Sequence, residues 1–123
     1  MKKMLVVDDD SLSQVLMSKI FGKEFDVDLC GSAEEYSDRY SNTLYDIIIM
    51  DISLKGNKDG FDLIKEIKTD PLRSGTQILC LTANAQNSMR LTAEESGADL
   101  FVTKPVANEK LKEAVSFLIN LNP

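Results

Sequence analysis

Short apolar runs alternate with amphipathic or polar segments along the whole chain. Five runs have the length of β-strands, at residues 4–7, 27–30, 46–50, 77–81 and 100–103. Three of them are continuously apolar, which is typical of parallel strands that helices cover on both faces. The segments between and after them predict helices over residues 11–22, 33–41, 61–69, 87–96 and 109–120. This alternation predicts a doubly wound α/β fold, in which five helices cover a five-stranded parallel sheet.

The predicted helices differ in how clearly they mark an inner face. The first and last helices each carry an apolar row at helical spacing, which we expect to face the core. These rows are Leu12, Val15, Leu16 and Ile20 in the first helix, and Leu111, Ala114, Val115 and Leu118 in the last. The third helix carries Phe61, Ile64 and Ile67 on one side, whereas segment 33–41 is polar and predicts a weak helix.

The length and charge of the chain indicate how many domains it forms and which partners are excluded. The 123 residues fit a single domain, residues 1–123, which can bury a core without disulfides or metal. The net charge of −6 and the lack of a basic patch argue against direct nucleic-acid binding. No apolar run approaches the roughly 20 residues of a membrane span, and no signal-peptide pattern is present. We therefore expect a cytoplasmic protein without a membrane partner.

Histidine and cysteine usage excludes several chemistries. The chain contains no histidine, which rules out Ser-His and Cys-His nucleophilic systems and imidazole metal sites. Its two cysteines, Cys30 and Cys80, are far apart in the sequence and lie beside apolar residues. We expect both to be buried free thiols.

Polar side chains follow four of the five predicted strands. They are Asp8, Asp9 and Asp10 after the first strand, Asp51 after the third, Thr82 after the fourth and Lys104 after the fifth. The carboxyl ends of parallel strands share one edge of the sheet, so these groups converge there. Clustered carboxylates raise one another's pKa unless a cation is present, and an all-oxygen cluster suits Mg²⁺ or Mn²⁺. A metal, a lysine and a hydroxyl around a carboxylate are the groups that phosphoryl transfer to aspartate requires.

Four segments of the sequence resemble the receiver domain of two-component response regulators. They read LVVDD at residues 5–9, DIIIMD at 46–51, LTA at 81–83 and FVTKP at 101–105, in the order of the family. The resemblance spans nearly the whole chain and implies a flavodoxin-like sheet with strand order 2-1-3-4-5. Segment 52–60 is one residue longer than the commonest form of the family.

The resemblance implies a role for each residue at the strand ends. Asp51 would accept the phosphoryl group, Thr82 would bond it and Lys104 would pair with it. Mg²⁺ (or Mn²⁺) would be held directly by Asp9, partly through water by Asp8, and by Asp51 and the backbone carbonyl of Ser53. The bond between Lys104 and Pro105 would be cis, and Phe101 would turn inward when Thr82 moves toward the phosphate. Ser53 and Asn84 occupy positions that resemble those tuning phosphate lifetime in relatives.

The function implied by this resemblance is a phosphoacceptor switch in a phosphorelay. A histidine kinase or a histidine phosphotransfer protein would donate the group in a Mg²⁺-dependent reaction. Phosphorylation would shift the face formed by residues 87–120, which a downstream effector protein or domain, or a second copy in a homodimer, would read. Such a domain is regulatory and catalyses only its own phosphorylation and dephosphorylation.

Two other functions fit parts of the pattern. The Asp-x-Asp at residues 8–10 resembles the motif of haloacid dehalogenase-type phosphohydrolases, but that function leaves Asp51 unexplained. A phosphorylation-silent interaction module would normally have lost an acid or the lysine, and the chain retains them all. Asp10 is better explained as the N-cap of the first helix than as a metal ligand.

Overall fold

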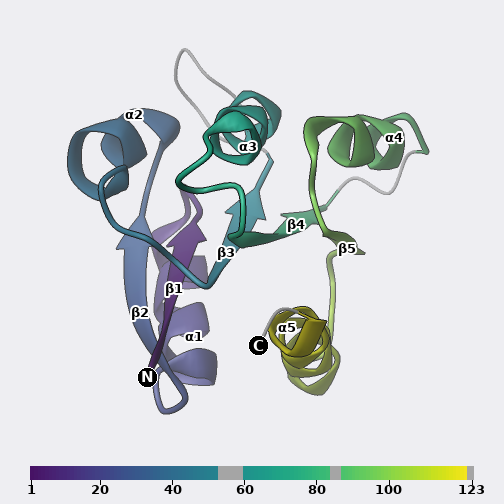
Figure 1. The fold of residues 1–123 in the computed structure, drawn as a ribbon. Coiled ribbons are helices and arrows are strands. Elements are labelled where there is room, and N and C mark those ends of the chain that lie inside the picture. Colours follow the sequence, from purple (N-terminus) through teal and green to yellow (C-terminus); the bar gives the residue numbers. More distant parts are fainter. Residues whose placement is uncertain (53–59, 84–86, 122–123) are drawn as a thin grey trace.

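The computed structural model describes residues 1–52, 60–83 and 87–121. Within these residues five parallel strands form one sheet in the order β2-β1-β3-β4-β5 (Figure 1). The strands are β1 (Lys2–Val7), β2 (Phe25–Cys30), β3 (Ile47–Asp51), β4 (Gln77–Thr82) and β5 (Leu100–Thr103). The predicted α/β fold, the parallel sheet and the strand order are all confirmed.

Helices cover both faces of the sheet (Figure 1). They are α1 (Ser11–Phe21), α2 (Ala33–Glu35) continued by the π-helix η1 (Tyr36–Tyr40), α3 (Gly60–Thr69), α4 (Asn87–Ser96) and α5 (Asn108–Leu121). Alternate strand residues point to opposite faces, so Leu5 and Val7 pack with α2, α3 and α4, whereas Met4 and Val6 pack with α1 and α5. None of the helices in the described part of the chain is long and apolar enough to cross a membrane.

Of the four residues in the apolar row predicted to face the core from the first helix, Ile20 packs against the core and the other three are half or more exposed. Leu12 is 79% exposed and Val15 and Leu16 are each 50% exposed, whereas Met17 and Phe21 are buried. Helix α1 carries two adjacent apolar rows, and helical periodicity alone does not say which of them packs against the sheet. The row of Leu12, Val15 and Leu16 is therefore an exposed apolar surface, which we call the α1 outer face.

The inner face predicted for the last helix agrees with the structure. Leu111, Val115 and Leu118 are buried in α5, and Ala114 packs against the same core. In α3, Ile64 and Ile67 are buried, and Phe61 is a partly buried neighbour of the core.

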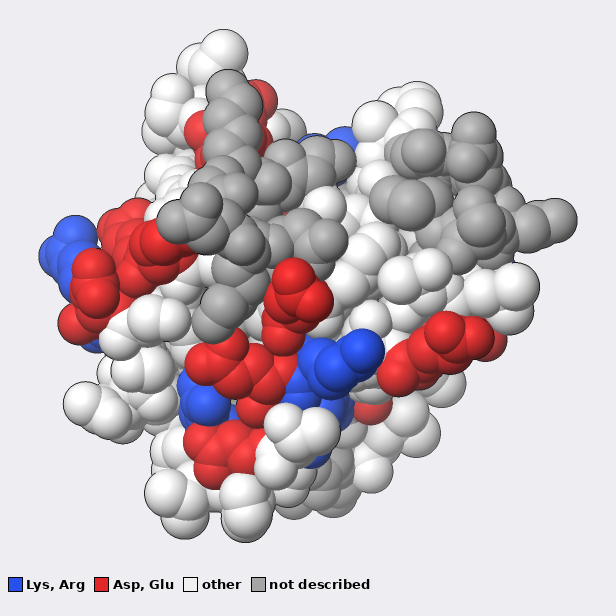
Figure 2. Space-filling view, turned by 90° about the horizontal axis from the view of Figure 1, so that it is seen from above, with Lys and Arg blue, Asp and Glu red and all other residues white. Residues whose placement is uncertain are grey.

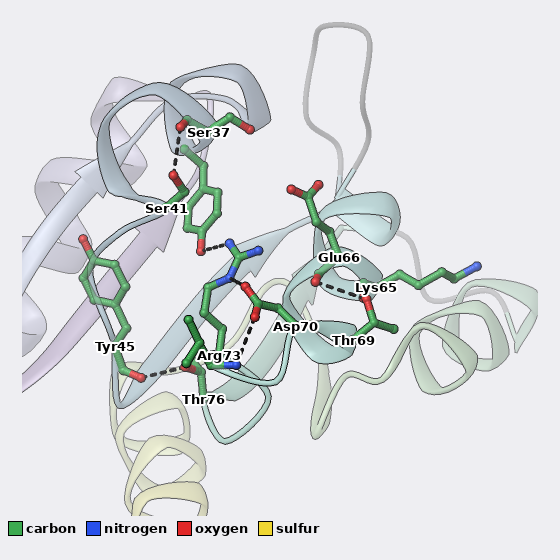
Figure 3. Close-up of polar contacts among 11 residues, drawn as sticks. Ser37, Ser41, Tyr45, Lys65, Glu66, Thr69, Asp70, Arg73 and Thr76 are labelled. Carbon is green, nitrogen blue, oxygen red and sulfur yellow. Dashed lines mark hydrogen bonds and ion pairs between the residues drawn. The ribbon is translucent and has the colours of Figure 1, made fainter.

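Segment 33–41 forms one turn of α-helix followed by a π-helix, instead of one weak helix. Tyr36, the first residue of η1, is buried, and its hydroxyl accepts a hydrogen bond from Arg73 Nη1 at 2.7 Å. Arg73 Nε also pairs with Asp70 Oδ2 at 2.6 Å, and Ser41 Oγ donates to the Ser37 carbonyl within the turn (Figure 3). The contact between Arg73 and Tyr36 joins residues 37 positions apart, in the segment before β4 and in η1, so local sequence propensity did not reveal it.

Both cysteines are buried free thiols, as predicted. Burial raises the pKa of the Cys30 thiol to about 11 and that of the Cys80 thiol to about 12. Both therefore stay protonated near neutral pH, and protonated thiols are poor nucleophiles.

Candidate functional site

Three carboxylates meet at the carboxyl edge of the sheet. Asp51 is the last residue of β3, and Asp8 and Asp9 directly follow β1, which pairs with β3. Oxygen atoms of the three carboxylates lie within 4.8 Å of one another. Asp8 is 2% exposed and Asp51 is 8% exposed, whereas Asp9 is exposed. The cluster is therefore buried at Asp8 and Asp51 and open to solvent at Asp9.

A lysine supplies positive charge to this cluster. Lys104 Nζ lies 3.7 Å from Asp51 Oδ2 and 3.9 Å from Asp8 Oδ2. The Lys104 backbone N–H donates to the Thr82 carbonyl at 2.7 Å, and the peptide bond between Lys104 and Pro105 is cis.

In the view from above, acidic side chains gather in the middle of the face with basic side chains beside them (Figure 2). The strand arrowheads of β1 and β3 point toward that viewing side in Figure 1.

The surroundings of Asp8 destabilise the charged form of its carboxyl group. Burial raises the pKa of its carboxyl above the ordinary 3.8, and the charge of Asp51 raises it further. The Asp10 backbone N–H, which donates to Asp8 Oδ1 at 2.9 Å, and the charge of Lys104 act in the opposite direction. One lysine does not offset the burial, so the geometry favours an additional cation.

The donor set of this cluster fits Mg²⁺. All three side chains offer carboxylate oxygens, the hard ligands that Mg²⁺ and Mn²⁺ prefer, and the open side leaves room for retained water. Their mutual repulsion is the kind that a divalent cation offsets. The fourth ligand expected from the sequence, the carbonyl of Ser53, lies outside the described residues, as does Asn84.

The predicted hydroxyl and aromatic residues lie on β4 and β5. Thr82 ends β4, is 1% exposed and pairs in register with Thr103 of β5. Phe101 lies two residues before Thr103 on β5 and is half-buried. The guanidinium carbon of Arg90, on α4, lies 4.9 Å from the centroid of the Phe101 ring. The Phe101 side chain is thus covered from α4 by a cation.

The acidic loop 8–10 is held by hydrogen bonds that sequence reasoning found only in part. Asp10 is the N-cap of α1, as predicted, since its Oδ1 accepts the Leu12 N–H at 3.2 Å. Gln14, which we did not single out, donates from Nε2 to the Asp8 carbonyl at 2.7 Å. Its position one turn after Asp10 was a usable signal, because helical side chains lean back toward the N-terminus.

An apolar cavity of about 540 Å³ opens beside Lys104. Its walls come from α1, from the end of β4 and from the segment that leads into α5. They include Leu16, Met17, Ile20, Leu81, Val106 and Leu111. Leu16 belongs both to this cavity and to the α1 outer face, so the exposed apolar surface continues to the lysine of the acidic cluster.

These features define the class of the chain: a doubly wound α/β domain with an acid–lysine site at the carboxyl edge of its sheet. The family model described as response regulator receiver domain matches residues 4–116. The chain belongs to this family.

Relatives of known name agree with this assignment. The chain is 28% identical to the regulatory protein VanRB of Enterococcus faecalis over 94% of this chain and 51% of that protein. It is 29% identical to the chemotaxis protein CheY of Halobacterium salinarum over 94% of each chain. A BeF3-activated receiver domain of DrrB, a Thermotoga maritima protein, superimposes with a TM-score of 0.88 at 26% identity, covering 98% of each chain.

The chain spans about half the length of several curated relatives that it matches, including VanRB and the transcriptional regulatory protein DltR of Streptococcus agalactiae. The shared part is the receiver domain, so the family assignment extends to a response-regulator receiver domain in a two-component system.

Proposed function

We propose that this receiver domain is a phosphoacceptor switch in which Asp51 accepts a phosphoryl group in a Mg²⁺-dependent reaction. The observation that carries the proposal is the setting of Asp51. It is a buried carboxylate 3.7 Å from a lysine, with two further carboxylates within 4.8 Å. The similarity to a receiver domain described as BeF3-activated supports the same chemistry.

The transfer requires little covalent chemistry from the protein. An oxygen of Asp51 attacks the phosphorus of a phosphohistidine, the P–N bond breaks, and the departing imidazole keeps its electron pair and takes up a proton. The product is an acyl phosphate on Asp51. Water later attacks that phosphorus, the P–O bond to Asp51 breaks, and inorganic phosphate and the carboxylate are released.

The residues around Asp51 stabilise charge during this transfer. Asp8, Asp9 and Asp51, with the Ser53 carbonyl, would hold Mg²⁺, which when bound neutralises charge on the phosphoryl oxygens. Lys104, whose Nζ lies 3.7 Å from Asp51 Oδ2, would pair with a phosphoryl oxygen. The Thr82 hydroxyl donates a hydrogen bond to another phosphoryl oxygen once it turns toward the phosphate.

The α4–β5–α5 side of the molecule, residues 87–120, would report the phosphate. Thr82 and Phe101 lie on adjacent paired strands, so a movement of Thr82 alters the space into which the Phe101 ring can turn. The acyl phosphate biases a pre-existing equilibrium between two positions of this ring. A downstream effector, or a second copy of the chain, would recognise the altered face.

The α1 outer face would receive the phosphodonor. Leu12, Val15 and Leu16 are exposed, and this surface continues through the cavity to Lys104, beside the acceptor carboxylate. An apolar patch at the entrance to a charged site is typical of a protein–protein contact. A histidine kinase or histidine phosphotransfer protein bound there would bring its phosphohistidine to Asp51.

The test is the intact mass of the protein after incubation with acetyl phosphate and Mg²⁺. We expect one added phosphoryl group in the wild type and in Asp38→Asn, an exposed carboxylate of η1, and none in Asp51→Asn or without Mg²⁺. Loss of the adduct in Asp38→Asn as well would remove the assignment to Asp51. If no variant carries an adduct and the wild type fails to bind beryllofluoride, the chain is a silent interaction module.

The same samples distinguish the phosphohydrolase alternative. A receiver domain turns over only its own acyl phosphate, so we expect no sustained hydrolysis of an aryl phosphate. Multiple turnover of p-nitrophenyl phosphate that survives Asp51→Asn and is lost in Asp8→Asn would favour the haloacid dehalogenase-type function.

A further inference from the structure

We propose that Gln14 is a positioning residue that holds the acidic loop 8–10 in the shape required for cation binding. This inference rests on the proposed function, because it concerns the Mg²⁺ site of that reaction. It assigns a role to a side chain that touches neither the cation site nor the phosphoryl group.

Gln14 fixes the loop at both of its ends. Its side-chain Nε2 donates to the Asp8 carbonyl at 2.7 Å, and its backbone N–H donates to the Asp10 carbonyl at 3.0 Å. Asp9, the exposed carboxylate of the cluster, lies between these two anchored residues. The backbone bond is the first i→i−4 bond of α1, which any residue at position 14 would make, so the side-chain bond to Asp8 is the contribution specific to Gln14.

Other hydrogen bonds hold the Asp8 backbone N–H and the Asp8 carboxylate. The Asp8 N–H donates to the Cys30 carbonyl at 2.9 Å, and Asp8 Oδ1 accepts the Asp10 N–H at 2.9 Å. These contacts fix Asp8 on the sheet side and tie it to Asp10. The Asp10 carboxylate ties the far end of the loop to α1, since it accepts the Leu12 N–H at 3.2 Å and the Ser13 hydroxyl at 2.9 Å. The bond from Gln14 adds a tie between α1 and the Asp8 carbonyl, at the near end of the loop.

The Gln14 side chain points toward the turn after β2. A Cβ atom built on Gly31 would lie 3.8 Å from Gln14 Nε2, so a larger residue at position 31 would contact the Gln14 amide. The Gly31 N–H donates to Glu35 Oε1 at 2.7 Å, which ties that turn to α2.

The hydrogen bond from Gln14 opposes the electrostatic repulsion among the three carboxylates. The carboxylates of Asp8, Asp9 and Asp51 repel one another, and without a cation a loosely held loop would relax by moving Asp9 outward. Holding the loop in place keeps the ligands close before the cation arrives. Removing groups that orient metal ligands typically weakens metal binding about 10- to 100-fold.

The experiment compares Mg²⁺ binding by calorimetry in the wild type, Gln14→Met and Ser18→Ala, with no phosphodonor present. Met has nearly the shape and helix propensity of Gln but has no N–H to donate. Ser18→Ala is a control on the same helix, one turn beyond Gln14 and about two turns from the loop. We expect the dissociation constant for Mg²⁺ to rise about 10-fold in Gln14→Met and to stay at the wild-type value in Ser18→Ala.

Thermal unfolding in EDTA separates a positioning role from a purely structural one. Unchanged Mg²⁺ affinity in Gln14→Met, with or without a lower unfolding temperature, overturns the inference and leaves the proposed function intact. A wild type that binds no Mg²⁺ overturns both. Gln14→Leu, a second helix-compatible side chain without a donor, decides the question should Gln14→Met fail to fold.

Discussion

At the scale of single residues, the buried carboxylate of Asp8 lowers the stability of the folded protein at neutral pH. Its carboxyl is 2% exposed and lies near Asp51 and Lys104. Burial, the largest cause, and the charge of Asp51 raise its pKa. Between the ordinary pKa of 3.8 and the raised folded-state pKa, the folded protein binds a proton that the unfolded chain has already released. Stability contributed by this group is therefore lost as the pH rises through that window.

We predict that Asp8→Asn stabilises the protein at neutral pH in the absence of divalent cations. Relief of a strained functional site commonly gains about 1 kcal/mol. The gain should be complete at pH 7 and shrink as the pH falls toward 3.8, where the wild-type carboxyl is protonated in both states. Urea unfolding of both proteins between pH 4 and 7.5 measures it, and a variant less stable than the wild type at pH 7 would contradict the account.

Single residues at the strand ends were predictable, whereas their hydrogen-bond partners were not. Asp8, Asp51 and Lys104 follow apolar runs directly, and parallel topology brings such positions to one edge. The bond from Gln14 to the Asp8 carbonyl depends on the turn that the loop makes before α1. The position of Gln14 one turn after Asp10 places its side chain near the loop, but only the turn decides whether the bond forms, so the sequence alone did not single out Gln14.

At the scale of elements, helix α1 shows the limit of periodicity as evidence. Both of its apolar rows have helical spacing, and three of the four residues interpreted as core are exposed, whereas Ile20 packs against the core. Two adjacent apolar rows on one helix have the same spacing whichever of them faces the sheet, so the pattern cannot distinguish them. The structure distinguishes them because Met17 and Phe21 contact the core.

Two truncations in α1 test which row carries the fold. Met17→Ala should lower the free energy of unfolding by about 2–5 kcal/mol, because it leaves a cavity against the sheet. Leu12→Ala should change it by no more than about 0.5 kcal/mol, since the side chain is 79% exposed. Chemical denaturation of the two variants decides, and equal losses in both would place the α1 outer face in the core after all.

A second contact between elements joins Phe101 of β5 to Arg90 of α4. Arg90 covers the Phe101 ring at 4.9 Å, a cation–π contact worth about 0.5–1 kcal/mol at an exposed site. If phosphorylation turns the ring inward, this contact favours the unphosphorylated position. Arg90→Gln should therefore raise the inward population of the unphosphorylated protein about two- to five-fold.

NMR chemical shifts of the Phe101 ring would measure that population, with Lys112→Gln on the exposed side of α5 as the control. The Arg90→Gln resonances should move along the line that joins the free and beryllofluoride-bound wild type. Resonances that stay at the free position would show that the contact does not bias the ring.

At the scale of the whole molecule, the alternation of strands and helices predicted the parallel sheet, but the strand order came from the family resemblance. Crossover rules permit several orders for five βα units, and the apolar runs of the three central strands β1, β3 and β4 are much alike. The family match over residues 4–116 and the observed order β2-β1-β3-β4-β5 agree with the order implied by that resemblance. The acidic cluster depends on it, since β1 and β3 must be neighbours.

Cation binding should stabilise the whole molecule. At a Mg²⁺ concentration 100 times the dissociation constant, binding to the folded state adds about 2.7 kcal/mol. For a domain of this size the unfolding temperature should rise by roughly 10 °C. Scanning calorimetry with and without Mg²⁺ measures the shift, which Asp9→Asn should largely abolish. An equal shift in Asp9→Asn would place the bound ion elsewhere.

The central claim is that the acyl phosphate forms on Asp51, and chemical trapping tests it most directly. Borohydride reduces an acyl phosphate of aspartate to homoserine, which marks the phosphorylated residue permanently. After incubation with acetyl phosphate and Mg²⁺, reduction and peptide mass mapping, we predict homoserine at position 51. Homoserine at position 8, 9 or 10, with position 51 unchanged, would contradict the account.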